Sequence, residues 1–203
     1  MRKIVLLFCI FLIYALFVKF CPFVTQTDIT VIKFLQEKFN DIPSFIPVLM
    51  DSKLYGALIT LSVISGIVFF FRKYLLIDMV LFASSPLVAY LLNIIIKNIV
   101  QRPRPPIELQ MAVQPSTYSF VSSHTLVTTT LFGLTAFYIN EYCQNKILKF
   151  SGIFLCILWI LFMGLSRILL AVHNLTDVIG GYFLGIILIF GYVKLIKLIG
   201  GKC

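Results

Sequence analysis

The stretch from Ser166 to Asp177 holds four side chains that could handle a phosphate: Ser166, Arg167, His173 and Asp177. His173 and Asp177 are four residues apart, so on a helix they would share a face and touch. A carboxylate beside an imidazole fixes its tautomer, which prepares a histidine for proton or phosphoryl transfer. Because ionisable groups near membrane depth are costly, such a cluster favours a functional role. The alternative is a polar turn between two spans with an incidental ion pair.

Two more cations flank a proline-rich segment earlier in the chain. Lys97 and Arg104 are seven residues apart and enclose a loop that reaches Tyr118. An arginine offers a bidentate fork and a lysine a point charge, so the pair could hold a phosphate. The alternative is that both cations snorkel to the membrane surface at a span end.

A serine-rich segment ending in His124 leads directly into an apolar run. Free backbone N–H groups at a helix start form an anion site, to which Ser122 and Ser123 would add hydroxyl donors. His124 in the first turn could protonate a leaving oxygen. The alternative is a helix capped by serines with a histidine at the interface.

The composition requires a membrane around these groups. The chain has 203 residues, of which 60% are hydrophobic and only 12% charged, and its mean hydropathy is +1.03. We therefore expect an all-α polytopic membrane protein with a single domain over residues 1–203. The net charge of +9 is placed mostly beside spans, which favours anionic lipid over nucleic acid as a partner. The five cysteines show no metal-ligand spacing and indicate no disulfides.

The apolar runs predict a bundle of six transmembrane helices. The expected spans are residues 4–24, 54–71, 75–96, 120–139, a fifth from the polar turn 141–149 to about 165, and 178–195. The first run resembles a signal peptide, but no small-residue cleavage site follows it, so a retained span is favoured. Between the first two spans, residues 25–51 predict a short amphipathic helix lying at the interface, packed on lipid rather than on a specific partner.

Six spans place both termini on one side and every candidate site segment on the other. The chain has only two histidines, and both fall on that second side. The numbers of lysines and arginines on the two sides of the membrane are nearly equal. We therefore leave out those in the candidate catalytic segments. The remainder favours cytoplasmic termini and a site facing the periplasm.

Taken together, the motifs resemble the three-part signature of the type 2 phosphatidic acid phosphatase (PAP2) superfamily. The first part is Lys97-x6-Arg104-Pro and the third is Ser166-Arg167-x5-His173-x3-Asp177. The middle part departs from the family, which usually has Pro-Ser-Gly-His where this chain has Val-Ser-Ser-His124. Losing the glycine adds a side chain where backbone should approach phosphate, so we expect a slightly altered fit.

The resemblance implies a lipid phosphatase of the bacterial cytoplasmic membrane that acts on undecaprenyl diphosphate or phosphatidylglycerophosphate. His173 would be the nucleophile, oriented by Asp177, and His124 the general acid. Phosphate oxygens would be held by Lys97, Arg104, Ser122, Ser123, Ser166 and Arg167. No metal, cofactor, nucleic acid or obligate protein partner is implied. Arg102 could assist in holding phosphate, but an ordinary loop cation is favoured. A lipid A phosphatase, a transporter of anionic lipids and a catalytically silent binding protein remain alternatives.

Overall fold

The computed structural model describes residues 2–39, 52–72, 75–112 and 116–199. Within these ranges the fold is entirely helical, with seven α-helices and one short 3₁₀ helix. The elements are α1 (Arg2–Phe20), α2 (Pro22–Lys38), α4 (Ser52–Arg72), α5 (Leu76–Val100), η1 (Ile107–Leu109), α6 (Ser123–Tyr142), α7 (Lys146–Leu169) and α8 (Leu175–Ile199). The predicted all-α class is therefore confirmed.

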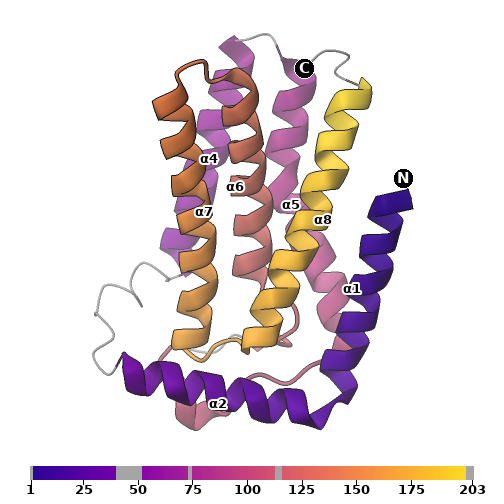
Figure 1. Cartoon of the computed structure of the whole chain (residues 1–203), viewed down its shortest axis with the longest axis vertical. Helices are drawn as coiled ribbons and strands as arrows, with labels where there is room; N and C mark the ends of the chain where they lie inside the picture. The colour runs from indigo at the N-terminus through magenta and orange to yellow at the C-terminus, as the bar shows by residue number, and fades with distance from the viewer. Residues whose placement is uncertain (1, 40–51, 73–74, 113–115, 200–203) are drawn as a thin grey trace.

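The long helices run side by side, and α2 lies across one end of the bundle (Figure 1). Helix α6 is central and packs against α5, α7 and α8, while α1 packs mainly on α8. Helix α2 contacts α7 and α8. The start of α1 and the end of α8 point away from the end that α2 crosses.

Four of these helices are long and apolar enough to cross a bilayer: α1, α5, α7 and α8. Large hydrophobic side chains are exposed along them, as expected for surfaces that face lipid. Helix α4 has a shorter apolar segment, Tyr55–Phe69. Helix α6 carries a run of buried threonines, because its neighbours rather than lipid surround it. The chain is an integral membrane protein, and the predicted count of six spans stays a prediction.

Some predicted boundaries were wrong. The first helix ends at Phe20 rather than near residue 24, because Cys21 is extended and Pro22 begins α2. Helix α2 buries Val24, Asp28 and Ile32 against the rest of the protein, so that face does not pack on lipid as predicted. Residues 40–51, which were included in the predicted interfacial segment, lie outside the described part of the chain.

Glycines allow α8 to approach α6 closely. A Cβ built on Gly185 would lie 2.7 Å from side-chain atoms of Thr129, and one on Gly181 would lie 3.1 Å from the Ser122 carbonyl oxygen. Small residues four apart on a helix face permit this kind of contact between membrane helices. Since α6 and α8 both carry candidate site residues near these contacts, the glycines help to set the geometry of the site.

We expect Gly185→Ala to lower the free energy of unfolding of the purified protein by about 1–3 kcal/mol, because the added methyl group overpacks the contact. Gly191→Ala on the same helix is the matched control, since a Cβ there meets nothing within 4 Å. Both variants gain the same helix propensity, roughly 0.5–1 kcal/mol. The difference between their unfolding temperatures in detergent therefore reports the contact with Thr129, and equal temperatures would contradict this packing.

Candidate active site

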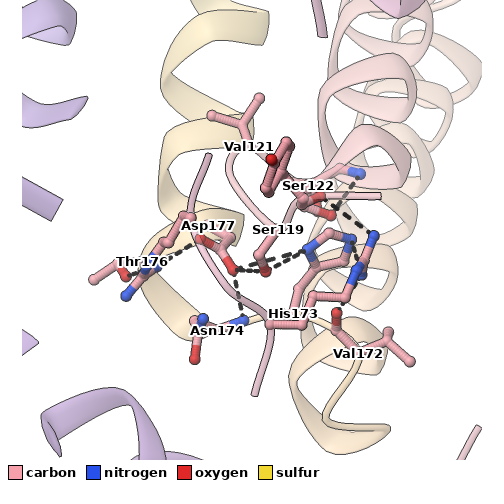
Figure 2. Close-up of polar contacts among 12 residues, drawn as sticks. Ser119, Val121, Ser122, Val172, His173, Asn174, Thr176 and Asp177 are labelled. Carbon is pink, nitrogen blue, oxygen red and sulfur yellow. Dashed lines mark hydrogen bonds and ion pairs between the residues drawn. The ribbon is translucent and has the colours of Figure 1, made fainter. Parts of the chain in front are cut away.

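The side chains selected from the sequence gather at the end of the bundle that α2 crosses. They come from the last turn of α5, the 101–122 loop, the start of α6, the end of α7 and the start of α8. Figure 2 shows how the loop and the α7–α8 turn bring Ser119, His173 and Asp177 together. Segments separated by more than 50 residues thus contribute to a single cluster.

Asp177 is fully buried, and its carboxylate accepts three hydrogen bonds. Its Oδ2 atom accepts the backbone N–H of Asn174 at 2.8 Å, which is one half of a capping box at the start of α8. The same oxygen accepts the Ser119 hydroxyl at 2.5 Å, and Oδ1 accepts Arg102 Nη1 at 2.5 Å. The carboxylate is therefore fixed in orientation, at a helix N-terminus where negative charge is favourable.

His173 lies in the turn between α7 and α8, whereas Asp177 lies in the first turn of α8, so the two residues do not share a helix. The turn is closed by hydrogen bonds from the N–H groups of Val172 and His173 to the carbonyl oxygen of Arg167, at 3.2 and 3.3 Å. Ala171 takes a left-handed conformation, with φ of 49°, to reverse the chain. The pair still meets: His173 Nδ1 is 3.8 Å from Asp177 Oδ2.

The surroundings of the His173 ring select one tautomer. Nδ1 is 3.4 Å from the Ser119 hydroxyl oxygen, which in turn donates to Asp177. Nε2 is 3.5 Å from Arg104 Nη1, and an arginine can only donate. The proton therefore sits on Nδ1, and the Nε2 lone pair accepts only this long contact from Arg104. Burial lowers the pKa of His173 to about 4, although the hydrogen bond to Asp177 raises it in part, so the ring is neutral at pH 7.

Arg104 joins the loop to the α7–α8 turn. Its Nε donates to the Thr117 carbonyl oxygen at 2.7 Å, and Nη1 donates to the Val172 carbonyl oxygen at 2.6 Å. Nη2 donates to the Thr117 hydroxyl at 3.1 Å. Burial lowers the pKa of Arg104, but a guanidinium stays cationic in proteins. The charge is thus held in place beside His173 before any ligand arrives.

Lys97 was predicted to begin the polar loop but lies in the last turn of α5. The helix continues to Val100, and Gln101 then caps it in a left-handed conformation. The Lys97 ammonium donates to the Tyr118 carbonyl oxygen, and one turn earlier Asn93 donates to the Val121 carbonyl oxygen at 2.8 Å. Both side chains therefore hold the loop against α5, and Lys97 is buried rather than snorkelling.

Two of the predicted site residues carry buried nitrogen atoms without a hydrogen-bond partner. Among the buried side-chain polar atoms of the described residues, those without a partner are His124 Nε2, Thr129 Oγ1 and Arg167 Nη2. Buried polar atoms are normally paired, so unpaired ones need an explanation. The charges of Arg167, His173, Lys97 and Arg104 act on the His124 ring. His124 therefore lies within electrostatic range of the other histidine and of these three cations.

The three serines play different parts. Ser122 is the N-cap of α6, its hydroxyl accepting from Thr125, and its own N–H donates to the Asp177 carbonyl oxygen at 3.1 Å. Ser123 and His124 begin α6, whose first N–H groups have no intrahelical acceptor. Ser166 lies inside α7, where its hydroxyl donates to the Met163 carbonyl oxygen. The N–H groups of Ser123 and His124 are therefore better placed as anion donors than the Ser122 hydroxyl.

Several residues of the cluster were missed in the sequence. Arg102, expected to be an ordinary loop cation, is buried between Asp28 of α2 and Asp177. The Asp177 and Asp28 carboxylates outweigh the effect of burial, so the pKa of Arg102 is raised. Tyr55 of α4 packs on His124 with ring centroids 4.4 Å apart. The one available signal was Asp28 itself, a carboxylate in line with Val24 and Ile32 on an apolar helix stripe.

The cluster is rich in cations and poor in metal ligands. Within the described residues, no three side chains of the His, Cys, Asp and Glu types are grouped so that they could hold a metal ion. The carboxylate nearest to His173 is already bonded to Arg102 and Ser119. What the arrangement can do chemically is to hold an anion next to a neutral imidazole nitrogen.

Fold and site together define an all-helical integral membrane protein with an anion-handling cluster at one end of its bundle. Residues 78–199 match the family model of the PAP2 superfamily. The chain belongs to this superfamily, which confirms the resemblance seen in the three motifs.

The relatives are bacterial enzymes. The phosphatidylglycerophosphatase B of Bacillus subtilis (strain 168) is 32% identical over 138 residues, which are 66% of this chain and 64% of that protein. The match thus spans slightly less than two thirds of the relative's length. The crystal structure of a transmembrane PAP2-type phosphatidylglycerolphosphate phosphatase from Bacillus subtilis superposes with a TM-score of 0.77 at 28% identity, over 98% of both chains.

Proposed function

We propose that the protein is a membrane lipid phosphatase that hydrolyses a phosphate monoester or diphosphate on a lipid through a phosphohistidine. The observation that carries this proposal is the environment of His173. Its proton is directed to Nδ1 by Ser119 and Asp177, and its Nε2 lone pair points to the side where Arg104 lies. An imidazole held in this way is a nucleophile ready for phosphorus.

In the first step, His173 Nε2 attacks phosphorus and the bond from phosphorus to the lipid oxygen breaks. His124 donates its proton to that oxygen, so the lipid leaves as an alcohol, or as a monophosphate from a diphosphate. Arg104, Arg167 and Lys97 hold the equatorial oxygens, assisted by the first N–H groups of α6. They supply the charge stabilisation that phosphoryl transfer requires.

In the second step, neutral His124 removes a proton from water, and the resulting hydroxide attacks the phosphohistidine. The bond between phosphorus and nitrogen breaks, which releases inorganic phosphate and restores both rings. Arg167 suits both steps because its Nη2 atom is buried without a protein partner. A phosphate oxygen would satisfy it, and leaving it unsatisfied costs free energy.

Phosphatidylglycerophosphate is the substrate favoured by the names of the two relatives. Undecaprenyl diphosphate is the other lipid that the site chemistry accommodates. We place α4 and α6 across the membrane with the other four long helices, α2 at the interface, the termini in the cytoplasm and the site at the outer face. Substrate would then enter sideways from the outer leaflet with its acyl chains still in lipid.

The test is phosphate release by the purified full-length protein in lipid vesicles containing a chelator of divalent cations. Four lipids are compared side by side: phosphatidylglycerophosphate, undecaprenyl diphosphate, phosphatidic acid and lipid A. We expect release from at least one of the first two and none from a His173→Gln control. Preferential release from lipid A would replace the proposed substrate. Equal phosphate release by wild type and control, or binding of all four lipids without release, would refute the proposed phosphatase activity.

A further inference from the structure

Asp28 lies on α2, outside all three sequence motifs, yet it is completely buried. Its Oδ2 atom accepts Arg102 Nη2 at 2.7 Å and the Thr176 hydroxyl at 2.6 Å. Its Oδ1 atom accepts the backbone N–H of Thr176 at 3.0 Å. A carboxylate this deeply buried is costly unless it is paired and hydrogen-bonded, and here both oxygens are engaged.

The contact with Thr176 caps α8 from another helix. The first N–H groups of an α-helix lack intrahelical acceptors and usually bond a side chain just before the helix. Here the N–H of Thr176 is taken by a carboxylate 148 residues away. The next residue of α8 is Asp177. Asp28 therefore fixes the backbone that presents the Asp177 carboxylate to His173.

The contact with Arg102 reaches the same carboxylate by a second route. Arg102 bridges the two acids, with Nη2 on Asp28 and Nη1 on both Asp177 and Thr176. Because Asp28 fixes one end of the Arg102 guanidinium, the other end holds Oδ1 of Asp177 in place. The other oxygen, Oδ2, is then left for Ser119 and the His173 side of the cluster.

We propose that Asp28 is a positioning residue for the reaction: it acts through Arg102 and the start of α8 to orient Asp177, and thereby sets the His173 tautomer. This inference deepens the proposed function and rests on it for its kinetic consequences. Asp28 touches neither His173 nor any reacting atom, so its effect should fall on the chemical step rather than on substrate binding.

The experiment compares Asp28→Asn with Asp78→Asn in the full-length protein reconstituted in lipid. Asp78 is the matched control because it is also a buried carboxylate, bonded to Tyr138 at 2.9 Å, but it lies at the start of α5, away from the site. We expect Asp28→Asn to lower kcat on the order of 10- to 100-fold through misplacement of the catalytic pair. We expect KM to change less than about twofold, as for an interaction made only in the transition state.

A second readout does not depend on turnover. The chain has only two histidines, so isotopically labelled histidine gives two sets of ring-nitrogen NMR signals, and His124→Gln assigns them. In wild type we expect His173 to carry its proton on Nδ1. In Asp28→Asn we expect a mixture of tautomers, and in Asp78→Asn the wild-type spectrum.

If Asp28→Asn fails to fold, Thr176→Val and Thr176→Ser replace it. The valine removes the hydroxyl shared by Asp28 and Arg102 at nearly constant volume, and the serine restores it. We expect the loss of kcat and the tautomer change in the valine variant and recovery of both in the serine variant.

The outcomes separate the two proposals. A reduced unfolding temperature with wild-type kcat and an unchanged His173 signal would make Asp28 merely structural and overturn the inference. If wild type itself hydrolyses no lipid, the proposed function fails and the NMR signals decide the inference alone. A tautomer change in Asp28→Asn would then still support the coupling to His173, and an unchanged spectrum would refute it.

Discussion

Replacing His173 with glutamine is expected to abolish phosphate release, with a fall in kcat of about 10³-fold or more, since the variant lacks the only proposed nucleophile. Glutamine keeps a polar side chain of similar length, so Asp177, Ser119 and Arg104 retain a partner and the fold should persist. The measurement uses a lipid substrate with a radiolabelled phosphate. Wild type quenched in base should carry label that acid removes, as expected for a phosphoramidate, and the variant should carry none.

The pH dependence of this labelling provides a second check. An ordinary histidine has a pKa near 6.5, whereas burial lowers the pKa of His173 to about 4. The ring therefore stays unprotonated, and nucleophilic, as the pH falls from 6.5 to near 4. We expect the rate of labelling at pH 5, corrected for ionisation of the substrate and of the general acid His124, to remain close to that at pH 7. A rate that halves near pH 6.5, or label in the glutamine variant, would contradict the assigned nucleophile.

Replacing His124 with glutamine is expected to slow hydrolysis of an alkyl lipid phosphate by about 10²- to 10⁴-fold, the usual contribution of a general acid. An aryl phosphate with an acidic phenol needs no proton at its leaving oxygen, so its first step should stay fast. The second step still needs a base for water. The variant should therefore release about one phenolate per protein molecule and then stall as the phosphohistidine.

The control for this experiment is His173→Gln, which should give no burst with the same aryl phosphate. Rapid mixing with detection of the phenolate measures both phases. If His124→Gln turns over the aryl phosphate steadily at the wild-type rate, His124 is not the base for water. If it loses the alkyl and aryl reactions equally, His124 is not the general acid.

The sequence predicted most of the helices because apolar runs longer than 18 residues have few alternatives to a membrane span. Helix ends were less accurate, for identifiable reasons. Pro22 starts a new helix although the apolar run continues past it. Helix α5 extends beyond Lys97 because the left-handed residue Gln101 ends it, not the first charged residue. The hydropathy of the side chains therefore does not show where the hydrogen bonds of a helix backbone end.

The candidate site could be predicted where two residues that act together are close in the sequence, as His173 and Asp177 are. It was not predictable where the partner is distant in the chain. Ser119 and Arg102 bond to Asp177 across 58 and 75 residues, and no periodicity links them. Asp28 shows that it is buried only through its alignment with Val24 and Ile32 on α2, and nothing in the sequence names Arg102 or Thr176 as its partners.

The docking of α2 across the end of the bundle bears on how the protein matures. During synthesis Asp28 leaves the ribosome before Arg102, and Arg102 leaves it before Asp177. A growing chain that contains only α1 and α2 therefore holds Asp28 without its Arg102 partner until the loop after α5 is made. Only when α8 has been made can Asp28 and Arg102 both contact it, so the cluster around Asp177 is completed after α1, α2 and α5 have been synthesised.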